Sequence, residues 1–86
     1  MTGKIKIIGA NNKSHLDWME KEFENCSIAF DGNTLHYVKV PDRGEFPFEI
    51  YKTLLIEDRF IIEGYAHIDD SLGRLAIEFF PQEKKP

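Results

Sequence analysis

The stretch FIIEGYAHIDDSLGRLAIEFFP, residues Phe60–Pro81, has the pattern of one long β-hairpin and contains the densest group of candidate core residues. Apolar and polar side chains alternate through residues 60–68, as in a strand whose successive side chains point to opposite faces of a sheet. The segment Asp69–Gly73 is rich in residues that favour turns, so we expect the chain to reverse there. Pro81 has no N–H group to donate and is expected to end the second strand.

The pairing within this hairpin depends on the length of its loop. A four-residue loop over Asp70–Gly73 would place Ile68 opposite Leu75 and Tyr65 opposite Glu78. One face of the hairpin is then wholly apolar and the other face is mixed. That distribution is typical of an antiparallel sheet that is covered on one side only.

Length and composition indicate one small domain over residues 1–81, followed by a polar tail over residues 82–86. The chain has 86 residues, of which 42% are hydrophobic, enough for a compact core. No apolar run approaches the roughly 20 residues of a membrane helix, and the first residues lack the pattern of a signal peptide. We therefore expect a cytoplasmic protein. Cys26 is the single cysteine, which excludes an internal disulfide framework and a cysteine-based zinc site.

The net charge of −4 bears on possible partners. It argues against general electrostatic binding to nucleic acid, which needs clustered Lys and Arg residues. It agrees with a protein that competes for a basic surface on a partner, and equally with a surface that serves only solubility.

The first half of the chain predicts a strand over residues 4–9 and then a helix. Ser14 and Asp17 form a short capping box at the start of this helix. Its apolar stripe recurs at three- and four-residue spacing and consists of Leu16, Met19, Phe23 and Cys26. Trp18 lies about 120° from the stripe. It therefore either covers the edge of the core or serves as a partly exposed anchor for a partner.

Residues 27–30 and 34–40 are expected to form a second hairpin. Its turn is Asp31-Gly32 or Gly32-Asn33, both of which suit a two-residue connection. With either turn the same four side chains share one face, namely Ile28, Phe30, Leu35 and Tyr37. The reverse face then carries Ala29, His36, Val38 and Val40.

The segment from Glu45 to Asp58 allows two interpretations. Pro47 suits the first turn of a helix, and Ile50 with Leu54 gives a four-residue apolar spacing. We prefer a helix over residues 47–57, because Glu57-Asp58 lacks the glycine that a tight hairpin normally has. A strand that turns at Glu57-Asp58 remains the alternative.

These elements predict an α+β fold with the order β-α-β-β-α-β-β. The first six match the ferredoxin-like plan, a two-layer sandwich in which two helices cover one face of an antiparallel sheet. If residues 47–57 are a strand, the expected fold is one helix packed on a longer antiparallel meander. In both versions the other face of the sheet is open.

Motifs for catalysis or cofactor binding are absent, so we expect neither an enzyme nor a bound cofactor. One polar group on the open face deserves weight as an alternative, and it consists of His36, Glu63, His67 and Glu78. Carboxylates beside imidazoles can bind a metal ion or a small ligand, with His36 and His67 as the weak metal candidates. On an open sheet, however, a solvated face with cross-strand pairs is the simpler interpretation.

The open face favours a different function, a non-catalytic protein-interaction module that acts as a small acidic adaptor or inhibitor. An aromatic and apolar centre with a polar border is typical of a protein interface. The expected partner-binding residues are Tyr65, Phe80, Val38, Val40, Trp18, Glu63 and Glu78. A homodimer through the sheet face or an edge strand is also possible. Single-stranded nucleic acid stacking on this face is the remaining alternative, and the acidic balance argues against it.

Overall fold

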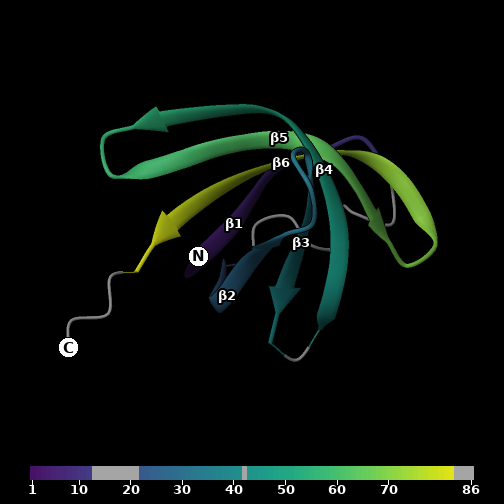
Figure 1. Ribbon diagram of the computed structural model, residues 1–86, viewed down its shortest axis with the longest axis horizontal. Coiled ribbons are helices and arrows are strands. Elements are labelled where there is room, and N and C mark those ends of the chain that lie inside the picture. Colours follow the sequence, from purple (N-terminus) through teal and green to yellow (C-terminus); the bar gives the residue numbers. More distant parts are fainter. Residues whose placement is uncertain (13–21, 42, 83–86) are drawn as a thin grey trace.

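The described residues form a closed barrel of six antiparallel strands (Figure 1). The computed structural model describes residues 1–12, 22–41 and 43–82. Each strand pairs with the next one in the chain, and the last pairs with the first. The strands are β1 (Thr2–Ala10), β2 (Glu22–Phe30), β3 (Leu35–Val40), β4 (Gly44–Ile56), β5 (Arg59–Ile68) and β6 (Ser71–Pro81).

The predicted α+β, ferredoxin-like fold is therefore wrong. No helix occurs within residues 1–12, 22–41 and 43–82, and so none there could span a membrane. Phe23 and Cys26, expected on the first helix, lie in β2. Residues 47–56, expected in the second helix, lie in β4, so the strand alternative for this segment is correct. The remainder of the first predicted helix, residues 13–21, lies outside the described residues.

Turn geometry explains why the helix was preferred over the strand. The tight turn between β4 and β5 is Glu57-Asp58, and Glu57 has a φ of 57°. The turn between β5 and β6 is Asp69-Asp70, with φ values of 51° and 63°. Tight hairpin turns require a positive φ, which glycine adopts freely and other residues adopt at some cost. In this chain acidic residues take those positions, so the lack of glycine did not indicate the lack of a turn.

The loop between β2 and β3 reverses the predicted faces of β3. Phe30 lies opposite His36, and the Asp31 N–H donates to the Leu35 carbonyl at 2.8 Å. Three residues therefore separate Asp31 from Leu35, in place of the two-residue loop that the sequence favoured. A shift of one residue exchanges the two faces of a strand. His36, Val38 and Val40 consequently point into the barrel, and Leu35 and Tyr37 point outward.

In the β5–β6 hairpin the predicted inner face is confirmed, but the register differs. The two-residue turn places Ile68 opposite Ser71 and Tyr65 opposite Arg74. Glu78, the predicted neighbour of Tyr65, instead lies opposite Ile61. The register moved by an even number of residues, so the apolar side chains stayed on the same face.

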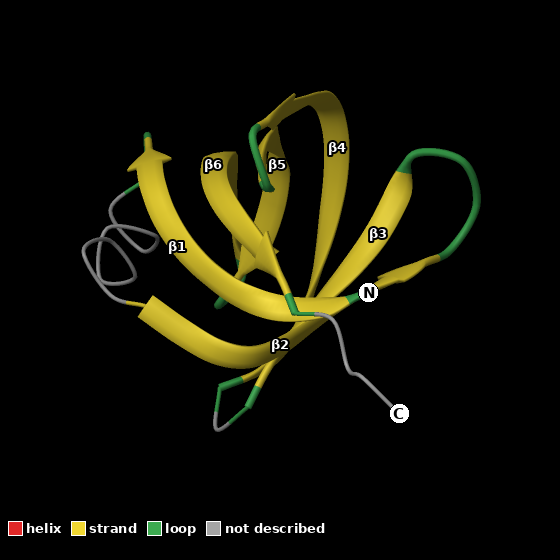
Figure 2. Cartoon of the chain, turned by 90° about the vertical axis from the view of Figure 1, so that its left-hand side faces the viewer, coloured by secondary structure: helices red, strands yellow, loops and turns green. Residues whose placement is uncertain are grey.

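The inner faces of all six strands meet in one core, as Figure 2 shows in the strands that curve around a common interior. Closure of the sheet allows its apolar face to be covered by strands of the same sheet, so no helical layer is needed. The buried hydrophobic residues are Ile5, Ile7, Cys26, Ile28, Val38, Val40, Phe46, Phe48, Ile62, Ala66, Ile68, Leu75, Ile77 and Phe79.

One hairpin extends beyond the barrel (Figure 1), and we call residues 51–60 the arm. β3 pairs with β4 only as far as Glu49, whereas β4 and β5 remain paired to their turn. A β-bulge between Ile50 and Lys52 marks the start of the arm. A Cβ atom at Gly64 would collide with the Glu49 carbonyl oxygen, so the close approach of β4 and β5 at this point depends on glycine.

Candidate binding surfaces

The arm exposes a continuous set of apolar side chains. Every residue from 51 to 58 is exposed, and the large apolar ones are Tyr51, Leu54, Leu55 and Ile56. Leu55 is 65% exposed. Apolar side chains this close together mark a surface that another molecule can cover.

The arm also has an open strand edge. Residues 51–56 of β4 pair with β5 on one side, and no described strand pairs with them on the other. About every second residue of a strand directs its N–H and C=O groups to each edge. An edge of this kind can pair with another strand, and long apolar edges are rarely left uncovered in folded proteins.

An ion pair joins the turn end of the arm to the neighbouring strand β6. Arg59 Nε lies 2.7 Å from Glu78 Oε2 on β6, and both side chains are partly buried. Lys52 and the turn residues Glu57 and Asp58 carry the other charges of the arm, and they are exposed. The arm thus combines an apolar centre with both signs of charge.

Beneath the arm, the barrel mouth contains an apolar cavity of about 150 Å³. Thr53 and Phe60 form the side of this cavity that belongs to the arm. The barrel supplies the remaining lining residues, which are Met1, Ile28, Phe30, His36, Ile50, Ile62 and Phe79.

His36 is the buried polar residue of the described part of the chain, at 7% exposure. Its Nδ1 atom lies 2.9 Å from the Thr34 carbonyl oxygen. A carbonyl oxygen only accepts hydrogen bonds, so Nδ1 carries a proton, and in the neutral form of the ring Nε2 is an acceptor. The edge of the imidazole packs against Phe30, with ring centroids 4.3 Å apart. The mouth therefore holds one oriented acceptor among apolar side chains.

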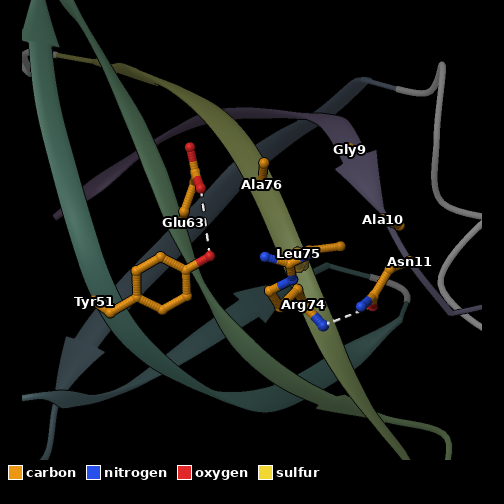
Figure 3. Close-up of a pocket in the computed structure, with 8 residues that line it drawn as sticks. All are labelled: Gly9, Ala10, Asn11, Tyr51, Glu63, Arg74, Leu75 and Ala76. Atoms are coloured by element: carbon orange, nitrogen blue, oxygen red, sulfur yellow. Dashed lines mark hydrogen bonds between the residues drawn. The ribbon is translucent and has the colours of Figure 1, made fainter.

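A third feature is a hollow of about 270 Å³ on the outer wall of the barrel (Figure 3). The Tyr51 hydroxyl donates to Glu63 Oε1 at 3.3 Å on one side. On the other side the Arg74 N–H donates to Asn11 Oδ1 at 2.8 Å. The hollow is open and polar, and the Tyr51–Glu63 contact connects it to the base of the arm.

Tyr65 lies on the outer wall, where the sequence placed it on an outward face. It is 44% exposed, and its ring centroid is 5.4 Å from that of Tyr51. Beside it lies a shallow groove of about 470 Å³, lined by Leu35, Pro47, Glu49, Tyr65, His67 and Leu72.

The structure does not bring together the other predicted partner-binding residues. Phe80 lies six residues beyond Arg74, the partner of Tyr65 on β6, which is about 20 Å along the strand. Its ring is covered by Lys4 Nζ at 4.7 Å. Val38 and Val40 are 0% and 2% exposed inside the barrel, so the expected shared surface does not exist. Trp18 lies outside the described residues.

The predicted histidine and carboxylate group is also divided. His36 lies inside the barrel mouth, whereas Glu63 and His67 lie on the outer wall. Glu78 is paired with Arg59. Within the described residues there is no group of three or more His, Cys, Asp and Glu side chains that could hold a metal ion.

Cys26 is fully buried in the described structure. Burial raises the pKa of its thiol to about 11. The Sγ atom lies 3.3 Å from the Phe23 carbonyl oxygen. The thiolate is the nucleophilic form of cysteine, and a raised pKa makes that form scarce. We therefore interpret Cys26 as a packed core residue.

The arm was not predicted from the sequence. Leu54 was expected on one side of a helix over residues 47–57, or on a strand that turns at Glu57-Asp58. A run of three apolar residues in a strand cannot place all its side chains on one face. A run of this kind directly before a turn could have indicated that at least one of its apolar side chains points to solvent.

Comparisons of the chain with protein-family models, with curated proteins and with solved structures found no match.

Proposed function

We propose that this protein is a non-catalytic protein-interaction module whose contact surface is the arm, and that the arm pairs with the arm of a second copy. The observation that carries the proposal is the open edge of β4 over residues 51–56, with Leu54, Leu55 and Ile56 exposed beside it. Pairing of exposed strand edges is a common route to assembly, because it satisfies backbone groups and covers side chains at once.

The sequence of the arm supports pairing with itself. In one antiparallel register of two β4 edges, Leu55 lies opposite its own copy and Leu54 lies opposite Ile56. The same register places Lys52 opposite Asp58 on both sides of the symmetry axis. A twofold contact must be self-complementary in this way, and the opposite charges at its ends add to its specificity.

This proposal replaces the open sheet face with the arm, because the outer wall does not bring the predicted partner-binding residues together and Val38 and Val40 are buried inside the barrel. In this proposal the paired module acts on a further protein as an adaptor or inhibitor. A cytoplasmic location is part of the proposal. The single buried thiol of Cys26 agrees with a reducing compartment.

Sedimentation equilibrium over about a hundredfold range of concentration tests the proposal. We expect the wild type to show a reversible dimer. Leu55→Lys should be monomeric, because a lysine on an edge strand opposes pairing. Leu72→Lys is the matched control, since Leu72 is 67% exposed and lies near the β5–β6 turn, away from the arm. It should associate as the wild type does.

A wild type that stays monomeric throughout the range would refute the proposal, and so would a Leu55→Lys variant that still dimerises. Thermal unfolding of the two variants shows whether each is folded. Both substitutions are at exposed side chains, so at concentrations where the wild type is monomeric the midpoints should remain close to that of the wild type.

A further inference from the structure

We propose that the barrel mouth is a binding site for a small, neutral, largely apolar molecule with one hydrogen-bond donor, such as a phenol. This site lies within one chain and is independent of the proposed pairing of arms. The inference rests on the size of the mouth cavity, on its apolar lining and on the fixed acceptor that His36 presents there.

The size of the cavity limits the ligand to about one aromatic ring. Its volume is about 150 Å³, and an apolar cavity of roughly this volume in another protein accommodates benzene. Phe60, Ile62 and Phe79 are among the side chains that would contact the ring. A ring of this size would gain apolar burial and aromatic contacts in the mouth.

The polar group of the ligand is determined by the tautomer of His36. Nδ1 is committed to the Thr34 carbonyl oxygen at 2.9 Å, so in the neutral form of the ring Nε2 offers a lone pair and no proton. Nε2 has no hydrogen-bond partner among the described residues. In an apolar site such an acceptor favours a ligand that donates an O–H or N–H group. It disfavours an anion, which would bring a second lone pair.

The other polar groups of the mouth do not change this preference. The ammonium group of Met1 donates to the Ile28 carbonyl oxygen at 3.2 Å, and because Met1 is exposed, water solvates its other N–H groups and screens its charge. Thr53 is also exposed, on the arm. His36 is therefore the buried polar side chain among the residues that line the cavity.

Titration of isotope-labelled protein with phenol and with toluene, followed by NMR, tests the site. Phenol should shift the signals of residues around the mouth, and it should bind up to about tenfold more tightly than toluene, which matches its shape without the donor. His36→Phe keeps an aromatic ring and removes the acceptor. It should reduce the ratio of the two affinities to about one.

A second pair of variants blocks the entrance without altering the core. Thr53→Trp places a large ring on the underside of the arm and should abolish binding of both probes. Lys52→Trp places the same ring on the opposite face of the same strand, so it should leave binding unchanged. Leu55→Lys should also bind phenol as the wild type does, because the site needs no second copy.

The absence of any shift with millimolar phenol in the wild type would overturn the inference. Equal affinities of the wild type for phenol and toluene would refute the role of His36. Binding that persists in Thr53→Trp would show that the probe occupies another place.

Discussion

The barrel core and the arm contain similar apolar residues but differ in their exposure to solvent. Ile62, Ala66 and Ile68 of β5 are buried among the other strands, whereas Leu54, Leu55 and Ile56 of β4 are exposed to solvent. All six belong to one hairpin, which a β-bulge interrupts between Ile50 and Lys52. The difference is the presence of strands on the other side of the barrel: the core has them and the arm does not. Burial in this fold therefore depends on strand length relative to neighbours more than on hydrophobicity.

The largest effect on stability should come from truncating a large apolar side chain in the core, and the same kind of truncation on the arm provides the comparison. Phe48 is 0% exposed in the core, and Phe48→Ala should lower the free energy of unfolding by about 3–5 kcal/mol through lost burial and the cavity left behind. At concentrations where the protein is monomeric, Leu55→Ala on the arm should change that free energy by less than about 0.5 kcal/mol. Chemical denaturation measures both values.

Phe48→Leu covers the case in which Phe48→Ala does not fold. It removes less volume, so its effect should lie between those of the other two variants. An arm variant that destabilises as much as a core variant would show that the arm is packed in solution, and the comparison would fail.

The second-largest effect on stability is expected at Gly64, where the arm joins the barrel. A Cβ atom at Gly64 meets the backbone of Glu49 and Ile50, and backbone cannot move aside as a flexible side chain can. Gly64→Ala should therefore cost about 1–3 kcal/mol, the range typical of overpacking. Gly9→Ala is the matched control, because its Cβ would lie 3.5 Å from the Ala76 Cβ, an ordinary contact.

Denaturation of both glycine variants provides the measurement, and amide exchange of the arm locates the effect. We expect faster exchange in residues 51–60 of Gly64→Ala, since the substitution separates β4 from β5 where the arm begins. Equal stability of the two variants would mean that β4 and β5 do not approach closely at Gly64.

The sequence predicted those features of the fold that depend on local patterns. Alternation identified β1, β5 and β6 and the inner face of the last hairpin, because side-chain period is a local property. The faces of β3 were wrong because they depend on one extra loop residue between Asp31 and Leu35. The assignment of residues 47–57 was wrong because the turn at Glu57-Asp58 contains no glycine, although β4 pairs with its neighbours in the chain, β3 and β5.

Closure of the barrel was beyond the sequence patterns that we used. An apolar inner face is the same whether helices or other strands cover it, so the pattern in β5 and β6 agreed with both folds. The reversed faces of β3 moved the candidate site, because Val38 and Val40 are core residues and His36 lies at the mouth. The arm was missed because the four-residue spacing of Ile50 and Leu54 fits one side of a helix as well as one face of a strand.

The smallest effect should come from the outer wall, where charged side chains face water. Lys4 Nζ lies 2.7 Å from Glu22 Oε1 across β1 and β2. The hydrogen bond with Lys4 lowers the pKa of Glu22 below its usual 4.5, and the bond with Glu22 raises the pKa of Lys4 above its usual 10.5. Both side chains are well solvated, so Glu22→Gln should reduce stability only slightly at neutral pH and low salt.

The pH dependence of that small difference follows from the directions of the two shifts. A carboxyl group with a lowered pKa stabilises the fold above pH 4.5, and the contribution is lost as the pH falls through its folded value. An amine with a raised pKa stabilises below pH 10.5, and the contribution is lost as the pH rises through its folded value. Thermal midpoints of the wild type and Glu22→Gln should therefore differ most between these limits and converge outside them.

The control is Glu49→Gln. Glu49 is an exposed glutamate on β4 without an ion pair in the described residues, so its substitution should show no such pH window. A Glu22→Gln effect as large as that of Phe48→Ala would mean that the wall, and not the enclosed inner face, carries the stability of the barrel.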